Sequence, residues 1–334
     1  MTIESICCFN FEAARTLSSV ASTHGHSFKV TARARVEQDV LEQSLADVCQ
    51  PWQMQDLNAF FSNPTDVLIA QHIADTLQQQ LGQVVKVELR SSPDVWVACT
   101  ENAIFHGLTA SFSAAHYLPN VPEGHQCGRL HGHGFKVKLW ADARLSDASA
   151  LEKAWLDVRA QLHHAYLNHI EGLENPTSEH LTEWLWQRLG AALPMRAVEV
   201  FETSTAGSRR DASGFTIWKE LRFEAACPFD DAGRYTGHSY LTRLYLHGSQ
   251  LDVHAGWLRD FAEVKAIFKP IYQQLDHYAL DCISDLSTYD NGSLAAWLVG
   301  QLNDTLPELR AVEVFESEQR GAAAYVQRSC DVHC

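Results

Sequence analysis

Three histidines and a cysteine in the middle third of the chain have the types and spacing of a metal centre. His131 and His133 are two residues apart in a segment with strand character, so their imidazoles face the same side. His116 ends the preceding strand-like segment, and antiparallel pairing of the two segments would bring it alongside. Three imidazoles suit zinc and leave its fourth position open, which is the catalytic pattern. The sequence therefore predicts a catalytic Zn²⁺ site.

Cys127 lies four residues before His131, and its spacing leaves two roles open. As a fourth ligand it would close a structural zinc site. As a base or nucleophile it would have its thiol pKa lowered by the nearby metal and by Arg129. His125 in the same segment is a competing ligand, which we interpret as a loop residue.

The composition excludes several classes of function. The 334 residues carry a formal net charge of −15, whereas nucleic-acid binding needs clustered Lys and Arg. No apolar run reaches the length of about 18 residues that a membrane-spanning helix needs. The first residues lack a secretory signal, so we expect a cytoplasmic protein. Its 9 cysteines are odd in number and lack framework spacing, which predicts mostly free thiols.

One pattern occurs three times along the chain and defines the elements that must position the histidines. The copies of its first motif are Phe11–Ala14, Phe112–Ala115 and Phe223–Ala226. The copies of its second motif are His24–Val30, His131–Val137 and, more loosely, Thr236–Leu241. Such self-similarity indicates tandem structural units. We predict units at residues 1–103, 104–220 and 221–334.

Each unit orders its predicted elements as two strands, two helices and a strand, with a further strand after Glu202 and Glu316. In the third unit, Asp260 and Glu263 form a capping-box pattern before a helix in which Pro270 permits a kink or a break. The second helix of the middle unit is predicted to begin near Asn175–Pro176. Its apolar face is Leu181, Trp184, Leu185 and Leu189. This order predicts an α+β fold with antiparallel sheets, which three units joined edge to edge can close into a barrel.

The segments Phe112–His116 and Cys127–His133 closely resemble the 6-pyruvoyltetrahydropterin synthase family. The Cys-x-x-x-His-Gly-His spacing is most similar to the bacterial branch, the 6-carboxy-5,6,7,8-tetrahydropterin synthases of the queuosine pathway. Residues 172–179, 201–207, 256–263 and 275–277 also resemble that branch. The resemblance covers nearly the whole chain, as three copies of what is normally one subunit.

The resemblance implies the tunnelling fold, in which three units close a pseudo-trimeric β-barrel with helices outside and two trimers stack. It also implies zinc-dependent lyase chemistry on 7,8-dihydroneopterin triphosphate. In such a site zinc binds the side-chain hydroxyls of the substrate and a cysteine is the general base. An Asp–His pair from a neighbouring subunit relays protons, and a glutamate anchors the pterin ring.

Matching the motifs residue by residue shows that no copy keeps the whole set. The first copy has Arg15 at the first zinc histidine, Val20 at the cysteine and Leu89 at the glutamate, and lacks the Asp–His pair. The third copy has Cys227 and Thr236 at two zinc positions and Ala232 at the cysteine, but keeps His238, Asp276, His277 and Glu316. The middle copy keeps the metal ligands, Cys127 and Glu202, but has His163-His164 where Asp–His is expected.

These losses are complementary, which predicts one complete site per chain between the second and third units. His116, His131 and His133 would bind the metal. Cys127, Asp276 and His277 would be catalytic, and Glu202 or Glu316 would bind the pterin, with Glu202 favoured. Cations for the triphosphate are predicted among Arg129, Arg209, Arg210, Lys265 and Lys269, whereas Lys136 and Lys138 alternate away from the zinc face.

The implied reaction is conversion of 7,8-dihydroneopterin triphosphate to 6-carboxy-5,6,7,8-tetrahydropterin, with release of acetaldehyde and triphosphate. One alternative is the same fold with 6-pyruvoyltetrahydropterin synthase or sepiapterin-cleaving activity. Another is a non-catalytic pterin-binding protein. Because three units per chain make a pseudo-trimer, a homodimer would reproduce the stacked pair of the family.

Overall fold

The structure is a computed structural model that describes residues 1–144, 148–230 and 232–327. It divides into two compact units. The larger unit comprises Met1–Ile104, Leu221–Leu244 and Ala266–Cys334, and the smaller unit comprises Phe105–Glu220 and Tyr245–Lys265. Within the described ranges, no helix combines the length and apolar character needed to cross a membrane.

The smaller unit contains an antiparallel sheet that is formed by the middle copy of the sequence pattern. Its strands are β6 (Ile104–His116), β7 (His131–Asp142), β8 (Met195–Thr203), β9 (Ala206–Asp211) and the first part of β10 (Gly214–Pro228). Phe112 pairs with Phe135 and His116 pairs with His131 in the β6–β7 register. Alternate residues of β7, from Phe135 to Ala141, are buried, as expected for a sheet with one covered face.

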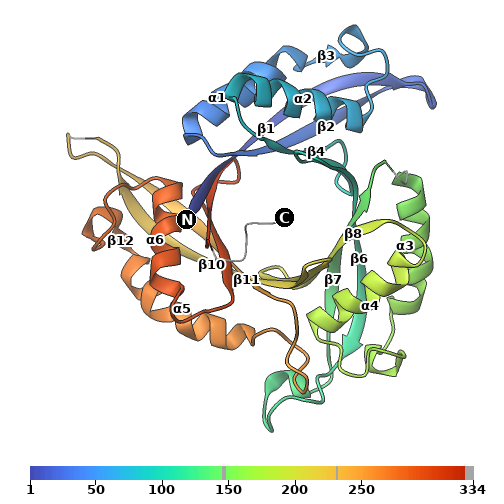
Figure 1. Ribbon diagram of the computed structural model, residues 1–334, viewed down its shortest axis with the longest axis vertical. Helices are drawn as coiled ribbons and strands as arrows, with labels where there is room; N and C mark the ends of the chain where they lie inside the picture. Colours follow the sequence, from blue (N-terminus) through green and yellow to red (C-terminus); the bar gives the residue numbers. More distant parts are fainter. Residues whose placement is uncertain (145–147, 231, 328–334) are drawn as a thin grey trace. The chain divides into compact units, whose positions relative to one another are not determined.

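Two helices cover this sheet face, α3 (Ala148–Leu162) and α4 (Ser178–Gly190), and Figure 1 shows them side by side in green. The predicted apolar face of α4 is confirmed, because Leu181, Trp184, Leu185 and Leu189 are all buried. The predicted start of α4 was two residues early. Thr177 is the N-cap and accepts a hydrogen bond from the amide of His180, so Pro176 precedes the cap.

The first copy of the pattern lies wholly in the larger unit. Its antiparallel strands are β1 (Thr2–Leu17), β2 (Val20–Ala34), β4 (Lys86–Arg90) and β5 (Val95–Cys99). Helices α1 (Gln38–Cys49) and α2 (Asp66–Leu81) pack on these strands around one apolar core. Short elements lie between the helices: η1 (Gln50–Trp52), β3 (Gln55–Asp56) and η2 (Leu57–Ala59).

Most of the third copy also belongs to the larger unit. It has the remainder of β10, β11 (Tyr235–Gly248), α5 (Phe261–Leu275), α6 (Asn291–Leu302), β13 (Leu309–Phe315) and β14 (Arg320–Tyr325). The short elements are β12 (Tyr278–Ala279) and η5 (Leu280–Cys282). β14 pairs antiparallel with both β13 and β1, so the first and third copies share one sheet.

The α+β class and its antiparallel sheets are confirmed, and the same order of elements occurs in all three copies, with the further strands β9 and β14 after Glu202 and Glu316. The bounds predicted for the three units stay a prediction. Two local predictions differ. Asp260 caps α5 through the amide of Ala262, but Glu263 pairs with Arg259 and makes no capping box. α5 continues through Pro270 without a break.

Candidate metal centre and the cavity beside it

The β6–β7 register brings the three predicted zinc histidines together in the smaller unit. His116 lies opposite His131, and the ring centroids of the three imidazoles are 4.5, 5.2 and 5.1 Å apart in pairs. With Glu202 they form a group whose candidate ligand atoms all lie within 4.8 Å of one another. The antiparallel pairing expected from the sequence therefore produces the predicted cluster.

In two of the rings, a hydrogen bond of Nδ1 determines that Nε2 is the atom left to bind a metal. His116 Nδ1 bonds the carbonyl of Pro176 at 3.0 Å, and His131 Nδ1 bonds the carbonyl of Arg129 at 2.7 Å. A carbonyl only accepts, so these Nδ1 atoms carry the proton and both Nε2 atoms offer a lone pair. The Nε2 of His116 is buried without a hydrogen-bond partner among the described residues. Such an orphaned lone pair, with its ring oriented by a carbonyl, fits a metal ligand.

Glu202 adds a negative charge to the three rings. Its Oε1 lies 3.3 Å from His133 Nε2 and 3.8 Å from His116 Nε2. Burial pushes the pKa of Glu202 upward, but the close contact with His133 and the electrostatic effect of the three histidines outweigh burial and hold the pKa below its usual value. Burial lowers the pKa of His116, against the opposing effect of the Glu202 charge. Sequence reasoning proposed Glu202 only for the pterin, whereas the geometry also gives it the position of a fourth donor.

A cavity of about 590 Å³ opens beside the cluster, and Cys127 lines it together with His131, His133 and Glu202. All the described residues that line this cavity belong to the smaller unit. Burial raises the pKa of the Cys127 thiol, and the charges of Glu202 and Asp260 add to the effect. A proton-abstracting thiolate here therefore needs a compensating positive charge nearby.

The loop that holds Cys127 is shaped by His125. His125 Nδ1 accepts a hydrogen bond from the amide of Cys127 at 3.2 Å, and its Nε2 lies 3.7 Å from Asp260. His125 is outside the four-residue donor group, so its interpretation as a loop residue agrees with the geometry. The thiol position thus depends on a histidine that is not itself a ligand of the cluster.

Glu179 is a cavity residue that sequence reasoning missed. Only 2% of its surface is exposed, and burial raises its pKa to about 7. Its Oε1 accepts from the amide of Leu258 at 3.0 Å, and its Oε2 accepts from the hydroxyl of Ser178. Its place in the first turn of α4 was the available signal, since a charged residue on a covered helix face is unusual.

Three cations line the cavity of this acidic chain: Arg129, Lys219 and Arg259. Only Arg129 had been predicted for the triphosphate. Arg209 and Arg210 instead form ion pairs, Arg209 with Glu199 and Asp211 and Arg210 with Glu183. Lys219 donates to the hydroxyl of Thr205, and burial lowers its pKa, with a contribution from Lys265.

Asp276 and His277 belong to the larger unit, where they form a pair. His277 Nδ1 lies 2.9 Å from the Asp276 carboxylate, which also accepts from Tyr272 and from the amide of Glu224. The bond from the Glu224 amide, followed by that from Tyr272, lowers the pKa of Asp276 to about 2. Their meeting with the histidines of the smaller unit stays a prediction.

The same backbone arrangement recurs in the other two copies, which identifies the equivalent residues. The amides of Glu12, Ser113 and Glu224 bond the side chains of Gln53, His163 and Asp276. The next residues are Met54, His164 and His277, which all have a positive φ, between 59° and 64°. Only the third copy therefore has the aspartate and histidine together at this position.

The registers correct one sequence assignment in the first copy. Lys29 pairs with Arg90 and the equivalent Lys136 pairs with Phe201, so Ser91 occupies the position of Glu202. The sequence comparison had placed Leu89 there, two residues too early. In the third copy Phe315 pairs with Gly321 as Phe201 pairs with Gly207, so Glu316 is the equivalent of Glu202.

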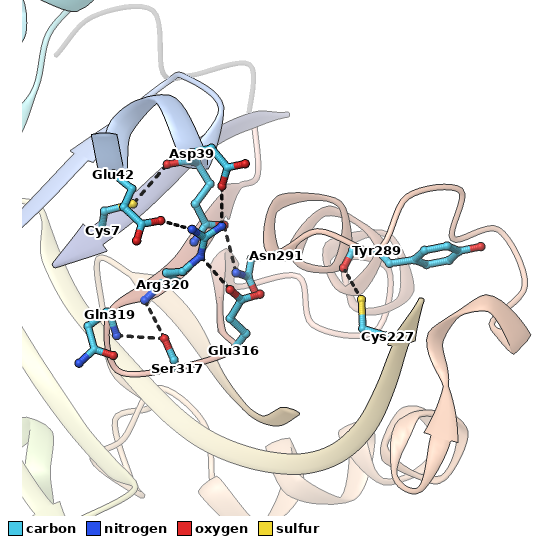
Figure 2. A network of polar contacts seen from close by, with 11 residues as sticks. Cys7, Asp39, Glu42, Cys227, Tyr289, Asn291, Glu316, Ser317, Gln319 and Arg320 are labelled. Carbon is cyan, nitrogen blue, oxygen red and sulfur yellow. Dashed lines mark hydrogen bonds and ion pairs between the residues drawn. The ribbon is translucent and has the colours of Figure 1, made fainter. Parts of the chain in front are cut away.

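Glu316 differs from Glu202 in its surroundings. Arg320 binds its carboxylate at 2.9 Å and also binds Asp39 and Glu42 from α1, as Figure 2 shows. In the same register, Arg320 stands where the middle copy has Ala206, a cavity residue. Glu316 is therefore committed to a guanidinium, whereas Glu202 faces the histidines and the cavity.

Comparison with known proteins gives one family. The model of the family "6-pyruvoyl tetrahydropterin synthase" matches residues 108–212 and again 216–327. The 6-carboxy-5,6,7,8-tetrahydropterin synthase of Synechocystis sp. is 44% identical over 114 residues, which are 30% of this chain and 86% of that protein. A provisionally named synthase of the same kind from Archaeoglobus fulgidus is 36% identical over 110 residues, 30% of this chain and 90% of that protein. The solved 6-pyruvoyl tetrahydropterin synthase of Caenorhabditis elegans matches 34% of this chain and 95% of its own, with 21% identity and a TM-score of 0.30.

Proposed function

Because the chain belongs to the 6-pyruvoyl tetrahydropterin synthase family, we propose that it is a zinc-dependent 6-carboxy-5,6,7,8-tetrahydropterin synthase. It converts 7,8-dihydroneopterin triphosphate to 6-carboxy-5,6,7,8-tetrahydropterin, acetaldehyde and triphosphate. The observation that carries this proposal is the cluster of His116, His131 and His133 with Glu202, beside a cavity that His131, His133 and Cys127 line. The names of the Synechocystis and Archaeoglobus relatives support the choice of product.

His116, His131 and His133 would hold the metal, with Glu202 as a further donor in the absence of substrate. When bound there, zinc supplies Lewis acidity that lowers the pKa of hydroxyl groups on the substrate side chain. The carbonyls of Pro176 and Arg129 keep the rings of His116 and His131 turned toward the same point. The protein thus presents a fixed set of nitrogen donors at the edge of the cavity.

Cys127 acts as general base, taking a proton from the substrate side chain. His277 exchanges that proton, and Asp276 holds its ring by accepting from Nδ1. The low pKa of Asp276 keeps its carboxylate ionised near pH 7, so it can accept the hydrogen bond from His277 Nδ1. The left-handed backbone at His277 is an unusual conformation for a non-glycine residue.

Glu202 is the pterin anchor of this proposal, accepting hydrogen bonds from ring N–H groups. Glu316 is the less suitable candidate because Arg320 already binds its carboxylate (Figure 2). Arg129, Lys219 and Arg259 supply positive charge for the triphosphate along the same cavity. The working form of this proposal is a cytoplasmic homodimer of pseudo-trimers, and the mass of the protein in solution tests that stoichiometry.

The decisive experiment is incubation of the zinc-loaded chain with 7,8-dihydroneopterin triphosphate. The proposal expects acetaldehyde and the 6-carboxy pterin in equal amounts, together with triphosphate. A 6-pyruvoyl product would assign the chain to a sister activity. So would turnover that occurs only when sepiapterin is supplied in place of dihydroneopterin triphosphate. His131→Ala is the matched control and should abolish both zinc binding and turnover.

A non-catalytic pterin-binding role is the second candidate, favoured by His163 and His164 at the Asp–His position of the middle copy. Such a protein would bind dihydroneopterin triphosphate and release it unchanged. Product identification separates this candidate from the enzyme, whereas metal content alone would not.

A further inference from the structure

The first copy keeps most of a metal centre that nothing assigns to it. Arg15 pairs with His24 in the β1–β2 register, as His116 pairs with His131 in the β6–β7 register. Arg15, His24 and His26 therefore occupy the positions of His116, His131 and His133. The rings of His24 and His26 are 5.0 Å apart, compared with 5.1 Å for His131 and His133.

Both histidines of the first copy have the orientation of ligands. His24 Nδ1 bonds the carbonyl of Ser22, two residues earlier, as His131 Nδ1 bonds the carbonyl of Arg129. His26 Nδ1 bonds the carbonyl of Ser91 at 2.7 Å. Since Nδ1 is the proton donor in each case, both Nε2 atoms carry a lone pair, and His26 Nε2 lies 3.3 Å from Arg15 Nη2.

The guanidinium of Arg15 takes the position of His116. Its Nη1 donates to the carbonyl of Pro64 at 2.9 Å, and His116 Nδ1 makes the same contact with the equivalent Pro176 at 3.0 Å. Its Nη2 lies 3.3 Å from His26 Nε2, the atom that would face a metal. Only 5% of the Arg15 side chain is exposed, so a permanent positive charge is buried beside His26.

Two neighbouring exchanges balance this charge. Asp66, at the position of Ser178 in the first turn of the second helix, binds Arg15 at 2.5 Å. Ser91, at the position of Glu202, donates to the other oxygen of Asp66 at 2.6 Å. The carboxylate beside the histidines thus lies on a strand in the middle copy (Glu202) and on a helix in the first copy (Asp66), where it pairs with the guanidinium. A random loss of ligands would not produce a complete ion pair.

We propose that the first copy is a latent zinc site in which the Arg15 guanidinium takes the place of the metal. The buried Arg15–Asp66 pair excludes divalent cations, and His24 and His26 remain as two oriented ligands. Replacement of Arg15 by histidine restores the third ligand and leaves the Asp66 carboxylate as a nearby anionic donor. The native chain accordingly binds metal in its middle copy and none in its first.

Zinc content per chain tests this inference on the full-length protein. The wild-type chain should hold one zinc and the Arg15→His variant two. Adding His24→Ala to Arg15→His should return the content to one, which places the new ion in the first copy. Arg15→Ala is the matched control, because it removes the guanidinium without supplying a ligand, and should hold one zinc.

The same measurement in a His131→Ala background separates this inference from the proposed function. There the middle copy cannot bind, so the content should rise from zero to one when Arg15→His is added. A folded Arg15→His chain that still holds one zinc would overturn the latent site and leave the proposed function intact. A wild-type chain with two ions, one lost on His24→Ala, would show that Arg15 does not exclude the metal. A wild-type chain with no zinc would contradict the proposed function instead.

Discussion

At the scale of single residues, the chemistry of the cavity depends on histidine tautomers and on carboxylate charges that are set before any ligand binds. His116 and His131 each have one nitrogen bonded to a backbone carbonyl, so the tautomer and the donor atom are set by the fold. Burial, followed by the negative charges of Glu202 and Asp260, raises the pKa of Cys127 and disfavours its thiolate. A cation in the histidine cluster would reverse that preference.

Cys127→Ser separates base catalysis from metal binding. If Cys127 is the general base, turnover should fall by about 10²–10⁴-fold because the serine hydroxyl is far less acidic than a thiol. Zinc content should stay at one, since the three imidazoles remain. Single-turnover rates and zinc content measured on the same preparation check both statements, and loss of zinc in this variant would instead make Cys127 a ligand.

Glu179 should give the folded chain a pH-dependent stability. Its pKa in the folded state is raised to about 7 from an ordinary value of 4.5, chiefly by burial. Between these values the unfolded chain loses the proton while the folded chain keeps it, so stability is fully present below pH 4.5 and falls as the pH rises to 7. The loss is on the order of 3 kcal/mol if the whole shift is expressed.

Denaturant unfolding of Glu179→Gln at pH 4.5 and pH 8 measures this effect. Relative to the wild type, the variant should gain stability between the two pH values, because glutamine carries no titrating proton. The exposed Glu171→Gln is the control and should not gain. Equal differences at both pH values would show that Glu179 is solvated or ionised throughout.

At the scale of elements, hydrogen bonds at the start of α4 fix a neighbouring segment that lines the cavity. The hydroxyl of Thr177 accepts from the amide of His180 as the N-cap of α4 and donates to the carbonyl of Gly256 at 2.7 Å. Asn175 likewise donates to the carbonyl of Ala255. These bonds attach the segment that contains Trp257 to the start of α4, next to Glu179.

Thr177→Ala should therefore cost more than the loss of a cap. An N-cap threonine contributes about 1 kcal/mol, and the bond to Gly256 adds about another 1 kcal/mol because its carbonyl loses a buried partner. Thr65→Ala is the matched control, since Thr65 caps α2 in the same way at the equivalent position. Unfolding free energies of the two variants should differ by about 1 kcal/mol, and equal costs would contradict the role of the Gly256 bond.

The elements were the most predictable part of the chain, for reasons that the errors make clear. The strands and helices follow hydrophobic periods that repeat three times, so each copy supports the others. The assignment of Leu89 failed because a strand has period 2, and a two-residue shift leaves the apolar alternation unchanged. Only the paired register shows that Ser91 is the equivalent of Glu202.

The site was predictable where candidate ligands lie on two strands that follow each other in the sequence and pair. It was not predictable where residues from elements far apart in the sequence come together. The His-x-His spacing and the strand end at His116 were sufficient for the triad. Glu179, Lys219 and Arg259 reach the cavity from separate elements, and although Glu179 and Arg259 lie in segments that resemble the family, nothing in those segments predicts that their side chains line the cavity. The ion pair of Arg15 with Asp66 needed the helix start of α2 beside β1, a tertiary contact that the sequence does not encode locally.

At the scale of the whole molecule, three copies of one unit have changed in different ways. The middle copy has the three histidines and Glu202 as candidate metal donors, whereas the first copy keeps two of the histidines and has the Arg15–Asp66 ion pair beside them. In the third, Cys227 stands at the position of His116, with its thiol directed to the carbonyl of Tyr289. The third copy alone keeps Asp276 with His277. The proposed function needs both the metal donors and the Asp276–His277 proton relay, and it therefore predicts that residues from two copies act together.

Asp276→Asn and His277→Ala test this division of labour. Each should lower turnover by about 10²–10⁴-fold, the usual range for a positioned acid–base group, while zinc content stays at one because the donors lie in another copy. His163→Ala is the matched control, since His163 has the same backbone environment in the middle copy and should leave turnover unchanged. If the control loses activity and the two variants do not, the relay belongs to the middle copy. The native His163-His164 pair would then be the working equivalent of Asp–His, and the third copy would serve only to complete the fold.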